Sequence, residues 1–311
     1  MSKLRRSNVP GLLDGRVVII TGAGRGIGRA HALAFAAEGA QVVVNDIGVG
    51  LDGSAGSSPA QEVVEEIKAA GGEAVTNGDD VADWGGAKNL VDTAVNSFGR
   101  LDVLVNNAGF LRDRMLANMS EEEWDAVIRV HLKGHFAPLR HAAAYWRDEF
   151  KAGNAVDARI INTSSAAGLQ GSVGQGNYAA AKAGISTLTL QAAAEMGRYG
   201  ITVNAIAPAA RTRMTEAVFA ETMAKPEDGA FDAMAPENVS PLVVWLGSPE
   251  SREVTGKVFE VEAGIIRVAE GWAHGPQVDK GARWDPSELG PVVTDLLGQA
   301  RTPVPVYGSQ G

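Results

Sequence analysis

Short apolar runs alternate along this chain with longer stretches in which apolar residues recur every three or four positions. The β-branched run Arg16–Ile20 precedes Gly26–Glu38, where apolar side chains follow helical spacing. Similar runs predict further strands at residues 41–45, 73–76, 101–105, 158–162, 201–206 and 257–261. Strands separated by helices form a parallel sheet with helices on both faces, so the pattern predicts an α/β fold with a doubly wound parallel sheet of about seven strands.

Three further helices are predicted by spacing and by end signals. Pro59–Ala70 has helical periodicity, and Ser120 with Glu123 forms a capping box that opens a long helix reaching at least to Leu132. Another long helix is expected from about Asn177 to Gly200, because helices often end at a glycine.

No internal repeat or linker divides the chain, so residues 1–269 are expected to form a single domain. Gly48–Ser58 is a loop rich in Gly and Ser. Residues 270–311 hold five of the 13 prolines and one short helical pattern after Pro291. This C-terminal extension is expected to contact the surface or a neighbouring subunit, with Trp272 and Trp284 as anchors.

Composition excludes several classes of protein. With 28 Lys+Arg against 37 Asp+Glu the net charge is −9, which disfavours binding to nucleic acid. The absence of cysteine excludes disulfides, zinc-thiolate sites and thiol nucleophiles, and no metal site is expected. No apolar run approaches the roughly 20 residues of a membrane span, and we see neither a signal segment nor a peroxisomal C-terminal address. These features favour a soluble, cytoplasmic protein without a membrane partner.

A glycine-rich turn, Thr21–Gly28, lies between the first strand and the first helix. It contains Gly22, Arg25, Gly26, Ile27 and Gly28. Glycines there allow a pyrophosphate to approach the helix N-terminus, where free N–H groups favour anions. A purely structural turn is the alternative, but the strand–turn–helix context favours nucleotide binding.

Asp46, at the end of the second predicted strand, indicates which nucleotide is bound. A carboxylate at this place accepts hydrogen bonds from the adenosine ribose and repels a 2′-phosphate. Arg25 is a contrary signal, because a guanidinium can hold that phosphate. We therefore expect NAD, with NADP as the alternative.

Tyr178 and Lys182 stand four residues apart on one face of a predicted helix, and Ser165 follows the strand before it. Hydride transfer from a secondary alcohol to nicotinamide requires a base for the hydroxyl proton, but a free tyrosine has a pKa near about 10. We expect the Lys182 ammonium and the cofactor's positive charge to lower the pKa of Tyr178. Ser165 would hold the substrate oxygen beside the phenol.

These motifs, together with Asn106–Gly109, resemble those of the short-chain dehydrogenase/reductase family over about residues 14–266. The resemblance implies a Rossmann domain, an active site built on Ser165, Tyr178 and Lys182, and a homodimer or homotetramer. It also implies that further residues border the cofactor: Asp80 and Val81 at the adenine, Asn107, Ala108 and Gly109 at the sheet end, Lys182 at the nicotinamide ribose, and Pro208 at the carboxamide.

His131 departs from the family pattern, because many members carry there an asparagine that supports a proton-relay water. His131 either holds this water through a ring nitrogen or is a satisfied core residue. The same departure occurs in a subgroup that the chain resembles more narrowly, through Phe110–Arg114, Arg129–Gly134, Gly174–Tyr178 and Arg213–Thr215. That subgroup is the (3R)-hydroxyacyl-CoA dehydrogenase module of peroxisomal multifunctional β-oxidation enzymes, also known as a 17β-hydroxysteroid dehydrogenase.

The combined prediction is an NAD-dependent dehydrogenase that oxidises a secondary alcohol, with a 3-hydroxyacyl thioester as the leading substrate. An NADPH-dependent 3-oxoacyl reductase, a steroid dehydrogenase and a non-catalytic NAD-sensing regulator are the alternatives. Residues 209–238 would form a substrate lid lined by Met214, Phe219, Met223, Phe231 and Met234. Arg112, Arg114, Arg211 and Arg213 either meet the phosphates of a CoA carrier or form surface salt bridges, and for each one singly the salt bridge is favoured.

Overall fold

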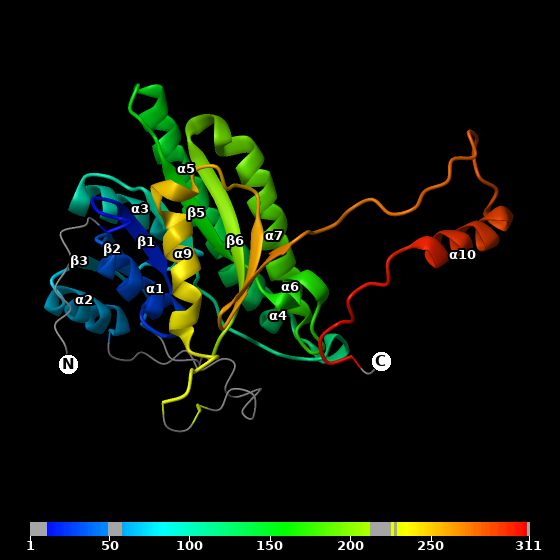
Figure 1. The fold of residues 1–311 in the computed structure, drawn as a ribbon, viewed down its shortest axis with the longest axis horizontal. Helices are drawn as coiled ribbons and strands as arrows, with labels where there is room; N and C mark the ends of the chain where they lie inside the picture. The colour runs from blue at the N-terminus through cyan, green and yellow to red at the C-terminus, as the bar shows by residue number, and fades with distance from the viewer. Residues whose placement is uncertain (1–10, 49–57, 212–224, 227–228, 310–311) are drawn as a thin grey trace.

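The computed structural model describes residues 11–48, 58–211, 225–226 and 229–309 (Figure 1). Most of the predicted loop 48–58 and the residues Met214, Phe219 and Met223 of the predicted lid lie outside these ranges. Within them, no helix is long and apolar enough to cross a membrane.

The sheet has the strand order β3-β2-β1-β4-β5-β6-β7-β8, in which all neighbours are parallel except β7 and β8. The chain crosses from β3 back over β1 to β4, so the strand order reverses between β1 and β4. The strands are β1 (Val17–Thr21), β2 (Gln41–Asn45), β3 (Glu73–Asn77), β4 (Val103–Asn106), β5 (Ala158–Thr163), β6 (Ile201–Ala209), β7 (Val258–Glu262) and β8 (Ile265–Ala269).

Helices cover both faces of the sheet, as the sequence pattern predicted. One face packs against α1, α2 and α9, and the other against α3, α5 and α7. The helices are α1 (Gly26–Ala37), α2 (Pro59–Ala69), α3 (Trp84–Phe98), α4 (Glu121–Ile128), α5 (Gly134–Lys151), α6 (Ala166–Gln170), α7 (Gly176–Met196), α9 (Ser240–Gly247) and α10 (Leu289–Gln299). A π-helical turn, Arg129–Lys133, joins α4 to α5.

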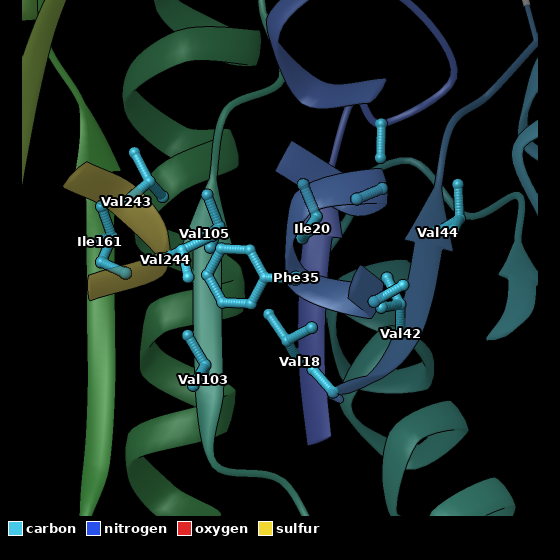
Figure 2. Packing of buried hydrophobic residues seen from close by; sticks show 14 of the residues in the cluster. Val18, Ile20, Phe35, Val42, Val44, Val103, Val105, Ile161, Val243 and Val244 are labelled. Carbon is cyan, nitrogen blue, oxygen red and sulfur yellow. The ribbon is translucent and has the colours of Figure 1, made fainter. Parts of the chain in front are cut away.

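Alternation along the strands explains this double-sided core. Val18 and Ile20 of β1 face α1 and α9, whereas Val17 and Ile19 face α3 and α5. On the first face the fully buried ring of Phe35 lies over the centre of the sheet (Figure 2). The predicted doubly wound α/β fold is therefore confirmed.

The eighth strand was not predicted. Glu262 pairs with Ile265 across a two-residue turn, in which Ala263 has a φ of +52°. Alanine rarely adopts this left-handed conformation, so Ala263-Gly264 lacks the Asn, Asp or Gly that usually marks the first position of a two-residue hairpin turn. The sheet therefore ends in an antiparallel edge strand.

Candidate active site

The candidate residues gather where the parallel strands end. Thr21 ends β1, Asp46 follows β2, Asn107 follows β4 and Ser165 follows β5. In open α/β sheets, ligands bind outside the carboxyl ends of the strands at the point where the strand order reverses, here between β1 and β4. The fold thus assembles a site from segments that are distant in the sequence.

The glycine turn after β1 requires its glycines. Gly22 and Gly26 have φ of +62° and +54°. A Cβ on Gly22 would lie 2.8 Å from Ala108 Cα, and one on Gly28 would lie 2.2 Å from Gly22 O. The turn therefore packs directly against the end of β4, and Ala108 contributes to this packing.

Thr21 and Asn107 fix the turn in place. Thr21 Oγ1 accepts hydrogen bonds from the backbone N–H groups of Asn107 (2.9 Å) and Ala108 (3.1 Å). The Asn107 amide donates in return to Thr21 O (3.0 Å) and Gly22 O (3.2 Å). The sequence pattern predicted no role for Thr21, although this residue opens the glycine motif.

The N-terminus of α1 suits an anion. Arg25 is the N-cap residue, but its side chain makes no capping hydrogen bond, and the first turn holds no acidic residue. By contrast, α2, α3 and α4 are capped by Ser58, Asp83 and Ser120. The first N–H groups of α1 thus lack a capping side chain, which fits the pyrophosphate of a dinucleotide.

Asp46 lies against the same turn. Its Oδ2 accepts a hydrogen bond from Gly24 N at 3.0 Å, and its Oδ1 accepts one from Gly48 N at 2.9 Å. A Cβ on Gly24 would approach Asp46 Oδ2 to 2.8 Å. The carboxylate is held beside the glycine turn, where a ribose can meet it and a 2′-phosphate would be repelled.

The other residues predicted to border the cofactor differ in burial and in contacts. Asp80 accepts a hydrogen bond from Ala82 N and forms an ion pair with Arg129 at 2.6 Å. Val81 is buried in the core on the face covered by α3, α5 and α7, whereas Ile27 packs against the core on the opposite face. Pro208 lies in β6 opposite Val261. Ile27 and Val81 therefore support the site at least partly through packing.

Tyr178, Lys182 and Ser165 come together at the start of α7. The Lys182 side chain is buried, and its Nζ donates to Thr163 O at 2.6 Å and lies 5.5 Å from the centre of the Tyr178 ring. Ser165 is the N-cap of α6, where its hydroxyl accepts a hydrogen bond from Ala167 N at 3.2 Å, and it lies close enough to Tyr178 to lower the pKa of that phenol. The predicted trio therefore forms one cluster.

Burial governs the titration of this cluster in the chain alone. Burial raises the pKa of Tyr178, and the neighbouring Ser165 hydroxyl only partly opposes this effect. Burial also lowers the pKa of Lys182 to about 7. The prediction that Lys182 and the oxidised cofactor together lower the pKa of Tyr178 concerns the cofactor-bound enzyme and stays a prediction; in the chain alone, desolvation of the phenolate has the largest effect on that pKa.

His131 lies within this cluster, on the π-helical turn. Its ring stands edge-on to Tyr178, with the ring centres 5.1 Å apart, and its Nε2 contacts Phe110 O at 2.7 Å and Phe110 N at 3.1 Å. A Cβ on Gly109 would lie 2.1 Å from His131 Cε1, so Gly109 makes room for the ring. Burial and the nearby Lys182 ammonium lower the pKa of His131 to about 3, which keeps the ring neutral. Among the described residues, Nδ1 has no hydrogen-bond partner.

Asn177 is a positioning residue that sequence analysis missed. It is completely buried, and its amide donates to Arg112 O (3.0 Å) and Glu123 O (3.1 Å). Its Oδ1 accepts from Tyr178 N at 2.7 Å. Asn177 thus connects the start of α7, beside Tyr178, to two other segments of the chain. Its position next to Tyr178 is the only sign of this role in the sequence.

The predicted arginines and lid residues are only partly described. Arg114 forms an ion pair with Glu123 at 2.9 Å, and Arg211 forms one with Asp232, as the salt-bridge alternative predicted. The Arg112 guanidinium lies over the Phe110 ring, 4.8 Å from its centre. Arg213 lies outside the described residues, and Phe231 is exposed in the part of the lid that the structure describes.

Comparisons with known proteins agree with this arrangement. The sequence model of the family described as short chain dehydrogenase matches residues 16–222. The hydroxyacyl-CoA dehydrogenase ChsB1 of Mycobacterium tuberculosis is 48% identical over 92% of this chain and 89% of its own length. The peroxisomal multifunctional enzyme type 2 of Mus musculus is 50% identical over 81% of this chain, which spans only 32% of that enzyme. A crystal structure of a short chain dehydrogenase from Mycobacterium avium superimposes with a TM-score of 0.87 at 75% identity, covering 96% of this chain and 100% of the other.

Proposed function

The chain belongs to the short-chain dehydrogenase family and is an oxidoreductase, and from this premise we propose that it oxidises a 3-hydroxyacyl thioester to the 3-oxo product with NAD. The observation that carries the proposal is the cluster of Ser165, Tyr178 and Lys182 beside a glycine turn that holds Asp46. The substrate class follows from the relatives named hydroxyacyl-CoA dehydrogenase and peroxisomal multifunctional enzyme.

The chain's own residues supply binding and proton chemistry. A bound NAD would supply the acceptor for the hydride of the carbinol carbon. The Ser165 hydroxyl holds the substrate oxygen beside Tyr178, and the Tyr178 phenolate takes the hydroxyl proton during oxidation and becomes the neutral phenol. Lys182 binds the nicotinamide ribose and stabilises the phenolate. His131 holds a water through Nδ1, the buried atom without a protein partner among the described residues.

The proposed cofactor site consists of the glycine turn and the strand ends around it. The turn contributes Gly22, Arg25, Gly26, Ile27 and Gly28, and the strand ends contribute Asp46, Asp80, Val81, Asn107, Ala108, Gly109 and Pro208. Because the pKa of Tyr178 is raised by burial in the chain alone, the positive charge of the oxidised cofactor is required to favour the phenolate.

The direct test is a comparison of kcat/KM among substrates and cofactors. We expect the highest value for a (3R)-3-hydroxyacyl-CoA with NAD, compared with hydroxysteroids and with NADP. A relative from Synechocystis named 3-oxoacyl-[acyl-carrier-protein] reductase is 40% identical over 82% of this chain, and Arg25 offers a partner for a 2′-phosphate. Preference for NADPH with a 3-oxoacyl substrate would therefore favour a reductase. NAD binding without turnover of any alcohol would instead favour a nucleotide-sensing regulator.

The proposed preference for NAD over NADP can be tested at the Asp46 side chain. Replacing Asp46 with serine is expected to raise the ratio of kcat/KM for NADP to that for NAD by about 10- to 100-fold, because a carboxylate near the 2′-phosphate is removed. The control is Asp92→Ser, which removes one exposed carboxylate from α3 and should leave the ratio unchanged. An unchanged ratio in Asp46→Ser would mean that Asp46 does not select the cofactor.

A further inference from the structure

One buried titratable side chain near the site, that of His135, has no part in the mechanism proposed above. His135 lies in the first turn of α5, four residues after His131, with a relative exposure of 1%. Burial lowers the pKa of His135 well below its ordinary value, and the nearby Lys182 ammonium and the His131 ring lower it further. The imidazole is therefore neutral, so one ring nitrogen can donate a hydrogen bond and the other can accept one.

The partner of this imidazole is a backbone group at the end of a strand ladder. The ladder between β4 and β5 ends at the pair Asn106 and Asn162, and Thr163 is the next residue of β5. Buried backbone groups need partners beyond such an end. Thr163 N donates to His135 Nε2 at 3.4 Å, and Thr163 O accepts from Lys182 Nζ at 2.6 Å. One residue of β5 thus connects the imidazole to the ammonium of the proposed active site.

Buried amide side chains hold His135 in place against this strand end. The Asn106 amide donates to His135 O at 3.3 Å and to Asn162 Oδ1 at 3.0 Å. Asn162 donates in turn to Thr189 Oγ1 on α7 at 3.0 Å. The two asparagines and the threonine are completely buried. This network therefore joins the start of α5 to β4, β5 and α7, the helix that also carries Lys182.

From this geometry we propose that His135 is a positioning residue of the proposed dehydrogenase site, and that it acts on Lys182 through the backbone of Thr163. The proposal rests on the function proposed above. The imidazole holds Thr163 by its N–H, and the carbonyl oxygen of the same residue then meets Lys182 Nζ at one fixed place. The ammonium is thereby kept 5.5 Å from the centre of the Tyr178 ring, where it stabilises the phenolate.

Two substitutions separate the effect of the accepting nitrogen from that of the bulk of the ring. His135→Leu removes the acceptor and keeps an apolar side chain of similar size, whereas the side-chain oxygen of His135→Gln can return an acceptor near the position of Nε2. We expect His135→Leu to move the titration of Tyr178 in the NAD complex about one pH unit higher, because a displaced Lys182 ammonium stabilises the phenolate less. At neutral pH kcat should fall about 10-fold, since the phenolate fraction falls by that factor. His135→Gln should restore both values.

This titration can be followed without turnover, from the ultraviolet absorbance of tyrosinate in protein saturated with NAD. Tyr178→Phe supplies the blank, so the difference spectrum reports Tyr178 alone. The control variant is His141→Leu, which removes another buried imidazole of α5, one that stands edge-on to Trp84. His141→Leu is expected to lower the urea midpoint of unfolding and to leave the titration at the wild-type pH. A purely structural part for His135 predicts the same result for His135→Leu.

An unshifted titration in folded His135→Leu, or a shift that folded His135→Gln shares, would overturn the proposal. If His135→Leu does not fold, His135→Asn takes its place, because its shorter side chain is polar but offers no acceptor at the position of Nε2. Failure of the proposed function gives a different result. A wild-type protein that binds NAD, with variants that titrate as expected but no oxidation of any hydroxyacyl thioester, would refute the function and support the positioning role.

Discussion

Replacing Tyr178 with phenylalanine is expected to lower kcat by about 10³-fold or more. Proton transfer by a positioned side chain contributes about 10²- to 10⁴-fold to the rate, and a phenylalanine ring has no group that can transfer a proton. The ring of Tyr178 remains packed against His131, so the substitution should not disturb the fold. Binding of NAD is expected to persist, because the glycine turn and Asp46 are untouched. Steady-state rates and NAD titration measure the two effects separately.

The matched control for this prediction is Tyr199→Phe. Tyr199 follows the far end of α7, where its ring contacts Phe150, and the substitution also removes a single hydroxyl. It should leave kcat near the wild-type value. Substantial turnover in Tyr178→Phe would show that another group carries the proton and would refute the proposed role of Tyr178.

Acidification below about pH 6 is expected to unfold the protein steeply, because three buried histidines are neutral in the fold. Burial lowers the pKa of His31 and of His131 to about 3, and it lowers that of His135 well below its ordinary value. The unfolded chain binds these protons near pH 6.5, so stability is fully present above that pH and is lost as the pH falls toward 3. Each histidine contributes about 1.4 kcal/mol per pH unit within this window. Lys182, whose pKa is lowered to about 7, contributes at higher pH and does not add to the slope.

Urea unfolding between pH 7 and pH 4.5 measures this slope at fixed protein concentration. His31 packs between α1 and α9, where its Nδ1 meets Ser240 Oγ at 2.9 Å and its Nε2 has no partner among the described residues. The double substitution His31→Leu with Ser240→Ala should reduce the slope by about one proton, or about 1.4 kcal/mol per pH unit. His274→Leu, at an exposed site, is the control and should leave the slope unchanged. An identical slope in all three proteins would contradict the assignment to His31.

The sequence alone determined the features that depend on local patterns. Short runs rich in β-branched residues predicted seven of the strands, and the central strands β1 and β4 are nearly apolar throughout because they are buried on both faces. The glycine turn and the pair Tyr178 and Lys182 were equally visible, because a tight turn and a spacing of four on a helix are set by neighbouring residues. The capping box at Ser120 followed from the same kind of information, and Gly200 ends the helical segment as predicted, although α7 itself stops at Met196 and a 3₁₀ turn fills the gap.

Tertiary structure decided the features that depend on contacts between distant segments. The pKa of Tyr178 is raised because other parts of the chain bury its hydroxyl, and no spacing rule contains that desolvation. The ring of His131 fits only because Gly109, on another segment, has no side chain. The roles of Thr21 and Asn177 arise from hydrogen bonds to backbone groups far along the sequence, and β8 forms through a turn that alanine rarely adopts. The pattern of apolar residues along a chain predicts which surfaces are buried. The residues that bury them, and the pKa shifts that this burial causes, are set only when the chain has folded.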